Sequence, residues 1–158
     1  MRWTLPEAWH ITLQFLGEST DERLGCLLSQ LNSVVAEPFK IALEGITCFE
    51  RAGVVAASIG LTAPLAALQR SVVRATALCG CIPEARPYTP HLTLARVRRG
   101  SRLRPKFLQQ RALQGHLRLP GFVAQEFLLY ESFLERDGAH YEVRARFPLK
   151  ASQARSQL

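Results

Sequence analysis

Cysteine and long apolar runs are scarce in this sequence, and each shortage excludes a class of protein. There are 4 cysteines in 158 residues, too few for a disulfide framework and without the paired CxxC spacing of zinc sites. We therefore expect Cys26, Cys48, Cys79 and Cys81 to be reduced thiols of a cytoplasmic protein. No apolar segment followed by a small-residue cleavage site marks a secretory signal near the N-terminus.

No long uncharged window of this chain favours a membrane span. The window 52–69 has no charge, but it contains two glycines and a proline, so a strand followed by a helix explains it better. We expect a protein that does not bind membranes.

Acidic residues are missing from one long stretch of the chain. Between Ala85 and Gln125 there is no Asp or Glu, and the net charge of the whole chain is +7. The same stretch holds nine basic residues: Arg86, Arg96, Arg98, Arg99, Arg102, Arg104, Lys106, Arg111 and Arg118. Such asymmetry favours a polyanionic partner, nucleic acid before membrane, and a merely solvated basic face is the alternative.

The hydrophobic pattern predicts an α+β fold with mostly antiparallel sheets. Strict alternation predicts strands over 9–16 and 91–97, and β-rich runs predict strands over 39–50, 54–62 and two more between 122 and 149. Helical spacing predicts helices over 17–37 and 62–78 and a short one over 106–113. We expect Ser19 and Glu22 to form a capping box, Pro38 to close the first helix, and Asp137 and Gly138 to turn a hairpin. Residues 1–150 then form a single domain, and 151–158 a flexible polar tail.

One pattern occurs twice, 81 residues apart: His10 with Thr12, and His91 with Thr93, each with apolar neighbours. Residues i and i+2 of a strand share a face about 6.6 Å apart, so two such strands facing across a cleft would present two imidazoles and two hydroxyls. Imidazole titrates near pH 6.5, so one can act as a base and the other as an acid. Hydroxyls can hold phosphate oxygens, so the set suits in-line displacement at a phosphodiester without a metal or cofactor.

The stretches "HITLQFLGE", "PHLTLARV" and "LYESFLERDGAHYEVRARFPL" resemble the RNA 2′,3′-cyclic phosphodiesterases of the 2H phosphoesterase superfamily, also called 2′-5′ RNA ligases. The likeness runs from Trp3 to about Leu149. It implies a bilobal fold with the motif strands lining a central cleft. Members usually have a further strand and helix before the first motif, so either the true start codon lies upstream or the N-terminal lobe is shortened and exposes a sheet edge.

The resemblance also implies roles for individual residues. His10 matches the proton donor to the departing 3′ oxygen, and His91 matches the base that activates water. Thr12 and Thr93 match the phosphate-binding hydroxyls, and Arg96 matches an arginine that steadies the phosphate and its developing charge.

The arginines that directly follow the second motif, Arg98 and Arg99 foremost, are expected at the rim of the cleft in contact with an RNA backbone. His116 and His140 lack a threonine partner and are expected at the surface. The expected partner is RNA with a 2′,3′-cyclic phosphate end, with no protein partner and a monomeric chain. Two alternatives stay open: a 2′-5′ oligonucleotide phosphodiesterase or ligase, and a catalytically impaired basic RNA-binding module.

Overall fold

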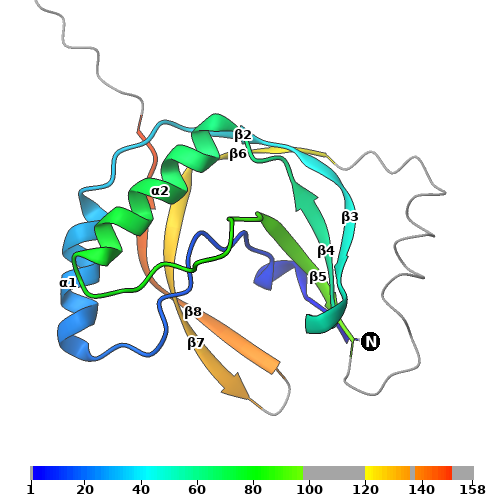
Figure 1. Ribbon diagram of the computed structural model, residues 1–158, viewed down its shortest axis with the longest axis horizontal. Coiled ribbons are helices and arrows are strands. Elements are labelled where there is room, and N and C mark those ends of the chain that lie inside the picture. The colour runs from blue at the N-terminus through cyan, green and yellow to red at the C-terminus, as the bar shows by residue number, and fades with distance from the viewer. Residues whose placement is uncertain (1, 98–119, 136–137, 151–158) are drawn as a thin grey trace, which may run out of the picture. The chain divides into compact units, whose positions relative to one another are not determined.

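The computed structural model describes residues 2–97, 120–135 and 138–150 of the chain (Figure 1). It divides into two compact units, each assembled from three stretches of sequence. Unit 1 comprises Met1–Leu13, Ile41–Leu61 and Pro87–Phe122, and unit 2 comprises Gln14–Lys40, Thr62–Arg86 and Val123–Leu158. The predicted helix over 106–113 and the predicted turn residue Asp137 lie outside the described residues.

Unit 1 is built on an antiparallel sheet with the strand order β1-β5-β4-β3. Its strands are β1 (Arg2–Trp3), β3 (Leu43–Phe49), β4 (Val54–Ile59) and β5 (His91–Arg96). The central strand β4 is almost entirely buried, which explains its run of small and β-branched side chains. The strands predicted at 54–62 and 91–97 are thus confirmed, each a little shorter than expected.

The connection between β3 and β4 depends on one glycine. A 3₁₀ turn, η2 (Glu50–Ala52), leads into Gly53, which has a φ of 62°, in the left-handed region that favours glycine. The carbonyl oxygen of Val97 lies 2.8 Å from the position that a Cβ of Gly53 would occupy, so a side chain has no room there. Gly53 therefore fixes the hairpin beside the end of β5.

The N-terminal segment differs from the continuous strand predicted over 9–16. β1 pairs with the end of β5, a 3₁₀ turn η1 (Pro6–Ala8) follows, and pairing resumes only at a single bridge between Ile11 and Leu92. Phe15, predicted to lie on the buried face of that strand, is 67% exposed. The predicted strand over 9–16 was therefore wrong: only Ile11 pairs, and the chain leaves unit 1 after Leu13.

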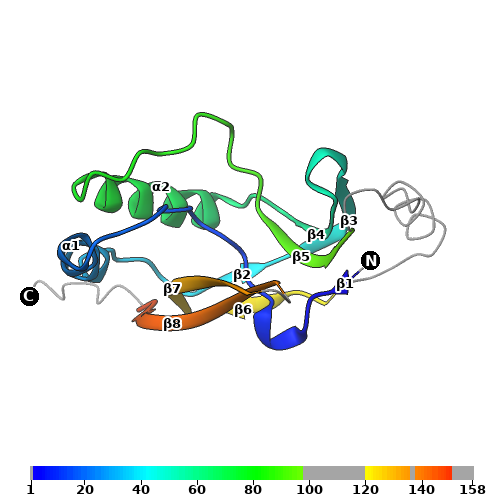
Figure 2. The ribbon, with the colours of Figure 1, turned by 90° about the horizontal axis from the view of Figure 1, so that it is seen from below.

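Unit 2 combines two helices with a hairpin. α1 (Asp21–Asn32) and α2 (Ala63–Ala77) pack against each other, and Figure 2 shows α1 down its axis and α2 lengthwise. The hairpin strands β7 (Glu126–Glu135) and β8 (Gly138–Pro148) pair from end to end. This confirms the hairpin that the sequence predicts at this place.

The first helix is shorter than predicted at both ends. Thr20, not Ser19, is the N-cap residue, and its hydroxyl accepts a hydrogen bond from the backbone N–H of Arg23. The helix ends at Asn32, where the N–H of Ser33 bonds back to Gln30, well before Pro38. The expected capping box and the expected closure by proline were therefore wrong.

A disulfide joins the two helices of unit 2, which corrects the expectation of four reduced thiols. Cys26 on α1 and Cys79 just after α2 are bonded, 53 residues apart in sequence. Their Cα atoms lie 5.8 Å apart because the helices pack side by side, a proximity that cysteine spacing does not reveal. Cys48 and Cys81 take no part in a disulfide.

The remaining pair of short strands, β2 (Phe39–Ile41) and β6 (Phe122–Ala124), forms a two-stranded sheet. The uncharged window 52–69 contains β4 and the start of α2, as predicted. In the described part of the chain, no helix has the length and apolar character needed to cross a bilayer. The α+β class is confirmed.

Candidate active site

The two His-x-Thr segments are neighbours at the edge of the unit 1 sheet. The sequence predicts two strands facing each other across a cleft, and the structure joins the segments directly through the antiparallel bridge between Ile11 and Leu92. Successive side chains point to opposite faces of a sheet. The residues on either side of Ile11 and of Leu92 therefore all point to the face that Ile11 and Leu92 do not occupy. Those residues are His10, Thr12, His91 and Thr93.

In this register each histidine stands opposite a threonine. His10 faces Thr93, and Thr12 faces His91, because residue numbers run in opposite directions on the two segments. Directly opposed Cβ atoms lie about 4.5–5.5 Å apart. All four side chains are partly accessible to solvent, so a small ligand can reach them.

Both imidazoles are held by the same kind of hydrogen bond. The Nδ1–H of His10 donates to the carbonyl oxygen of Ala8 at 2.8 Å, and that of His91 donates to the carbonyl oxygen of Thr89 at 2.9 Å. A carbonyl oxygen only accepts, so Nδ1 carries a proton in both rings. The Nε2 atom of each histidine is then the one that gains or loses a proton during a reaction.

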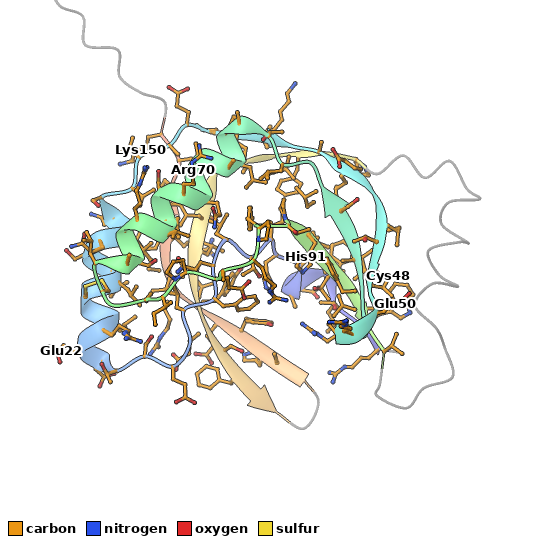
Figure 3. All side chains as sticks on the ribbon, viewed as in Figure 1. Glu22, Cys48, Glu50, Arg70, His91 and Lys150 are labelled. Carbon is orange, nitrogen blue, oxygen red and sulfur yellow. A yellow bond between two sulfur atoms is a disulfide. The ribbon has the colours of Figure 1, made fainter. Side chains whose placement is uncertain are left out.

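Two aromatic residues hold this arrangement in place. The ring of Phe49, at the end of β3, lies 4.7 Å from that of His91 at an interplanar angle of 55°; Figure 3 labels His91 on β5. The hydroxyl of Tyr88 donates to the carbonyl oxygen of Thr12 at 3.1 Å, which ties the two motif segments together. Burial raises the pKa of Tyr88 to about 12, so this donor keeps its proton throughout the physiological pH range. Sequence reasoning missed both residues, although Tyr88 stands only three positions before His91.

Arg96 reaches the face of the motif through an irregularity in β5. It follows His91 by five residues, and in a regular strand an odd separation places two side chains on opposite faces. The pairing of β5 with β4 contains a shift: Thr93 pairs with Ala56, but Ala95 pairs with Val55. Leu94 is the extra residue of this β-bulge.

The bulge reverses the alternation and brings Arg96 onto the same face as Thr93. Arg96 pairs with Val54, and Val54 shares a face of β4 with Ala56, the partner of Thr93. The exposed Arg96 side chain therefore belongs to the face of the two histidines. Its spacing in the sequence alone would have placed it on the other side.

Most of the other candidate residues cannot be compared with this group. Arg98, Arg99, the further basic residues from Arg102 to Arg118 and His116 lie outside the described residues. His140 lies on β8, exposed and 3.9 Å from Glu142, as predicted for a surface residue. No group of three or more His, Cys, Asp or Glu side chains in the described ranges is arranged to hold a metal ion.

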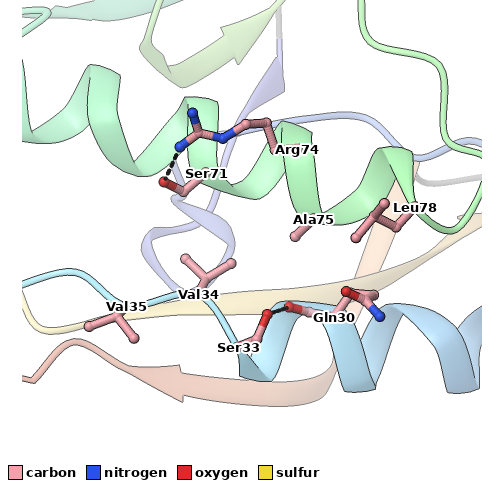
Figure 4. A pocket seen from close by; sticks show the side chains of 8 residues that line it. All are labelled: Gln30, Ser33, Val34, Val35, Ser71, Arg74, Ala75 and Leu78. Atoms are coloured by element: carbon pink, nitrogen blue, oxygen red, sulfur yellow. Dashed lines mark hydrogen bonds between the residues drawn. The ribbon is translucent and has the colours of Figure 1, made fainter.

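Unit 2 carries a separate, open depression of about 250 Å³ between the end of α1 and the outer face of α2 (Figure 4). Arg74 and Ser71 on α2 face it and are hydrogen-bonded to each other at 3.3 Å. None of the motif residues lines it. Its lining contains no His, Asp, Glu or Cys that could act as an acid or a base, so the candidate site stays with the motif face of unit 1.

The arrangement of the two motifs agrees with comparisons with known proteins. A sequence model of the 2′-5′ RNA ligase superfamily matches residues 6–128, a span that contains both motifs. The chain belongs to the 2′-5′ RNA ligase superfamily. The resemblance expected from the two motifs is thereby confirmed.

Relatives within the 2′-5′ RNA ligase superfamily cover nearly the whole chain. An RNA 2′,3′-cyclic phosphodiesterase of Geobacillus stearothermophilus is 31% identical over 153 residues, covering 93% of this chain and 47% of that protein. One of Aeropyrum pernix is 30% identical over 146 residues, covering 90% of this chain and 82% of its own length. The chain thus spans about half the length of the first of these relatives.

A solved structure of the same superfamily shares the fold. E. coli LigT, complexed with 3′-AMP, superposes with a TM-score of 0.73 and 25% sequence identity. The match covers 95% of this chain and 82% of LigT. The α+β fold predicted from the sequence pattern is therefore shared with LigT.

Proposed function

We propose that this protein hydrolyses 2′,3′-cyclic phosphate ends of RNA to 2′-phosphates, without a metal, by acid–base catalysis between two histidines. The observation that carries the proposal is the bridge between Ile11 and Leu92, which puts His10 and His91 on one face with a threonine opposite each. The names of the relatives from Geobacillus and Aeropyrum support the substrate class.

The proposed reaction is an in-line displacement at phosphorus. Neutral His91 takes a proton from water through Nε2, and the water oxygen forms a bond to phosphorus as the bond to the 3′ oxygen breaks. Protonated His10 delivers its Nε2 proton to that leaving oxygen. Afterwards His91 is protonated and His10 is neutral, and exchange with solvent restores the starting state.

The rest of the motif face serves the charge that builds on the phosphate. Thr12 and Thr93 donate hydroxyl hydrogen bonds to the nonbridging oxygens, and Arg96 supplies a guanidinium for phosphate binding. The carbonyl oxygens of Ala8 and Thr89 stabilise whichever imidazole is protonated, because each accepts the Nδ1–H at 2.8 and 2.9 Å. Arg98 and Arg99 contact the RNA backbone in this proposal.

A second candidate reaction uses the same residues on a different bond. The family description refers to 2′-5′ RNA ligation, in which a 5′ hydroxyl takes the place of water, forms the bond to phosphorus and displaces the 3′ oxygen, while the bond to the 2′ oxygen is kept. Cleavage of a 2′-5′ link is the reverse step. Both activities need both histidines. A basic RNA-binding protein without catalysis would need neither.

The test uses an RNA oligonucleotide with a 2′,3′-cyclic phosphate end, in EDTA, with the phosphate position of the product identified. We expect a 2′-phosphate, and a loss of rate of about 10²–10⁴-fold for His10→Ala or His91→Ala. His140→Ala is the matched control, because His140 is an exposed histidine of β8 with no place in the site. Turnover retained in either motif variant, or a strict metal requirement, would refute the proposal. RNA binding without any hydrolysis would leave the binding-module alternative.

A further inference from the structure

The two motifs differ in how their backbones are held. The second lies on a strand, β5, that is paired along its length, whereas among the described residues 9–16 of the first motif segment only Ile11 pairs with β5, through a single bridge. A single bridge supplies fewer backbone hydrogen bonds than a ladder. Side-chain contacts therefore contribute more to the position of His10 than to that of His91.

Gln14 makes one such contact, two residues after Thr12. Its Oε1 accepts a hydrogen bond of 2.7 Å from the hydroxyl of Thr76, which lies 62 positions away near the end of α2. Thr76 is completely buried, and Nε2 of Gln14 is also buried, with no hydrogen-bond partner among the described residues. Burying an amide that makes only part of its hydrogen bonds is unfavourable, so the bond to Thr76 largely decides whether Gln14 keeps its place.

The hydroxyl of Thr76 has a second acceptor within reach. The carbonyl oxygen of Val73, in the preceding turn of α2, lies 3.1 Å from the same Oγ1. A hydroxyl carries one proton, so it donates fully either to Gln14 or to Val73. The bond to Gln14 can thus be lost without leaving the hydroxyl unpaired, and a small displacement of the helix end selects between the two arrangements.

The disulfide fixes the end of α2 that carries Thr76. Cys79, three residues after Thr76, is bonded to Cys26 of α1. The N–H groups of Cys79 and Cys81 both donate to the carbonyl oxygen of Thr76, at 2.9 and 3.2 Å. The position of Thr76 is therefore coupled to the covalent link with α1.

We propose that Gln14 is a positioning residue for the first motif, anchored through Thr76 to a helix end that the disulfide locks, so that reduction of the disulfide lowers activity. This inference rests on the proposed hydrolysis for the reaction that is affected. Gln14 acts through the backbone that leads from it to Thr12 and His10. The oxidised protein is then the more active form.

The redox step is a thiol–disulfide exchange with a dithiol reductant. One thiolate of the dithiol attacks a sulfur of the Cys26–Cys79 bond, forms a mixed disulfide and releases the other cysteine. The second thiol of the reductant then displaces the first cysteine. The protein gains two electrons and two protons, and the dithiol loses them and becomes a disulfide. Both cysteines are partly accessible to solvent, so a small dithiol can reach the bond.

The first test measures steady-state kinetics of the oxidised proteins on a cyclic-phosphate oligonucleotide. We expect Gln14→Ala and Thr76→Val to lower kcat by about threefold to tenfold with KM nearly unchanged, because a loosely held His10 spends less time in the reactive geometry. Thr76→Ser keeps the hydroxyl and should recover most of the loss. Gln30→Ala is the matched control, a half-buried glutamine on α1. An unchanged kcat in Gln14→Ala, or a Thr76→Ser as impaired as Thr76→Val, would overturn the inference.

The second test asks whether the disulfide acts through Gln14. The value of kcat is measured with and without dithiothreitol in the wild type and in Gln14→Ala, and circular dichroism of the same samples shows whether they stay folded. We expect reduction to lower kcat by about threefold to tenfold in the wild type and to have little further effect in Gln14→Ala. An equal loss in both proteins, as unfolding of unit 2 would cause, or no loss in the wild type, contradicts the inference.

A third measurement does not depend on catalysis. Exchange of the backbone amide hydrogens of residues 9–16 is followed by mass spectrometry, with β4 as the internal reference. We expect reduction to speed this exchange in the wild type, and Gln14→Ala to show the faster exchange in both redox states. If this pattern is found but no cyclic phosphate is hydrolysed, the anchor is present and the proposed reaction is wrong. If hydrolysis proceeds and neither exchange nor kcat responds to Gln14→Ala, the inference about the anchor is wrong.

Discussion

The ring of Phe49 lies 4.7 Å from the imidazole of His91, tilted by 55°. Phe49 stands at the end of β3 and His91 at the start of β5, so the contact spans the width of β4. The hydrogen bond from Nδ1 of His91 to the carbonyl oxygen of Thr89 holds one edge of the imidazole. The Phe49 ring limits how far the imidazole can rotate. Together they hold Nε2 in one direction.

Replacing Phe49 by leucine should lower kcat by about tenfold and leave KM nearly unchanged, because a loosely held base spends less time in the reactive geometry. Steady-state kinetics on a cyclic-phosphate oligonucleotide measure both constants. Phe15→Leu is the control, because Phe15 is 67% exposed and lies in unit 2. An unchanged kcat for Phe49→Leu would mean that the Nδ1 bond alone orients His91.

The Tyr88 hydroxyl holds the first motif segment from a distance of 76 residues. Tyr88→Phe removes this hydrogen bond and leaves the ring, so we expect about 1 kcal/mol less stability and a kcat several-fold lower. Urea unfolding and kinetics of the same variant provide the two values. A loss of stability with full kcat would show that Thr12 keeps its place without Tyr88.

Tyr88 should also make stability sensitive to alkaline pH. Its pKa is about 12 in the folded protein because of burial, against 10.0 for the ordinary side chain. The unfolded chain therefore releases this proton first, and the stabilisation that is complete below pH 10 is lost as pH rises towards 12. Allowing for partial exposure, we expect the wild type to lose about 1–2 kcal/mol more than Tyr88→Phe between pH 9 and pH 12 in urea unfolding. Parallel losses in the two proteins would contradict a buried Tyr88.

Reduction of the Cys26–Cys79 disulfide should destabilise unit 2. The bond closes a loop with a sequence separation of 53, for which the chain-entropy relation predicts about 4 kcal/mol. Thermal unfolding with and without dithiothreitol measures the effect, and the double variant Cys26→Ala, Cys79→Ala should show no response to the reductant. A wild type that also shows no response would mean that the thiols are not bonded in solution.

Gly53 and Gly25 form a matched pair for backbone effects. Gly53→Ala should cost about 1–3 kcal/mol, because φ is 62° and the new Cβ would lie 2.8 Å from the carbonyl oxygen of Val97. Gly25→Ala lies inside α1 with nothing within 4 Å of its Cβ, so it should stabilise by about 0.5–1 kcal/mol. Differential scanning calorimetry checks both signs, and a stable Gly53→Ala would mean that the turn relaxes freely.

Much of this fold is local in origin and could be predicted from the sequence. β5 alternates from His91 to Leu94, and its partner β4 is a short apolar run bounded by glycines, so both strands follow from pattern alone. α2 carries its apolar residues at helical spacing after Thr62 and was placed nearly to the residue. That the two motifs come together was also predictable, because a repeated His-x-Thr is an unusual coincidence, but the sequence predicted strands facing across a cleft and not the direct bridge between Ile11 and Leu92.

The features that were missed arise from contacts between distant residues. The disulfide depends on how α1 and α2 pack, and the interruption before Ile11 depends on which residues find partners along β5. The bulge at Leu94 coincides with the one break in the alternation of "HLTLAR", the apolar pair Leu94 and Ala95, but that break alone did not show that Arg96 changes face. Tertiary packing determines these details, and the hydrophobic periodicity of the sequence does not predict them.

The interrupted edge beside β5 also affects how the chain tolerates changes in its length. The backbone N–H of Thr4 donates to the carbonyl oxygen of Leu94, and Ile11 pairs with Leu92. Between these two contacts the N-terminal segment advances by seven residues and β5 by two, and η1 accommodates the additional residues. That turn ends at Ala8, whose carbonyl oxygen accepts the Nδ1–H of His10. A change of length within Pro6–Ala8 is therefore expected to move the first histidine, whereas a peptide inserted at Leu5, between β1 and the turn, leaves that hydrogen bond in place.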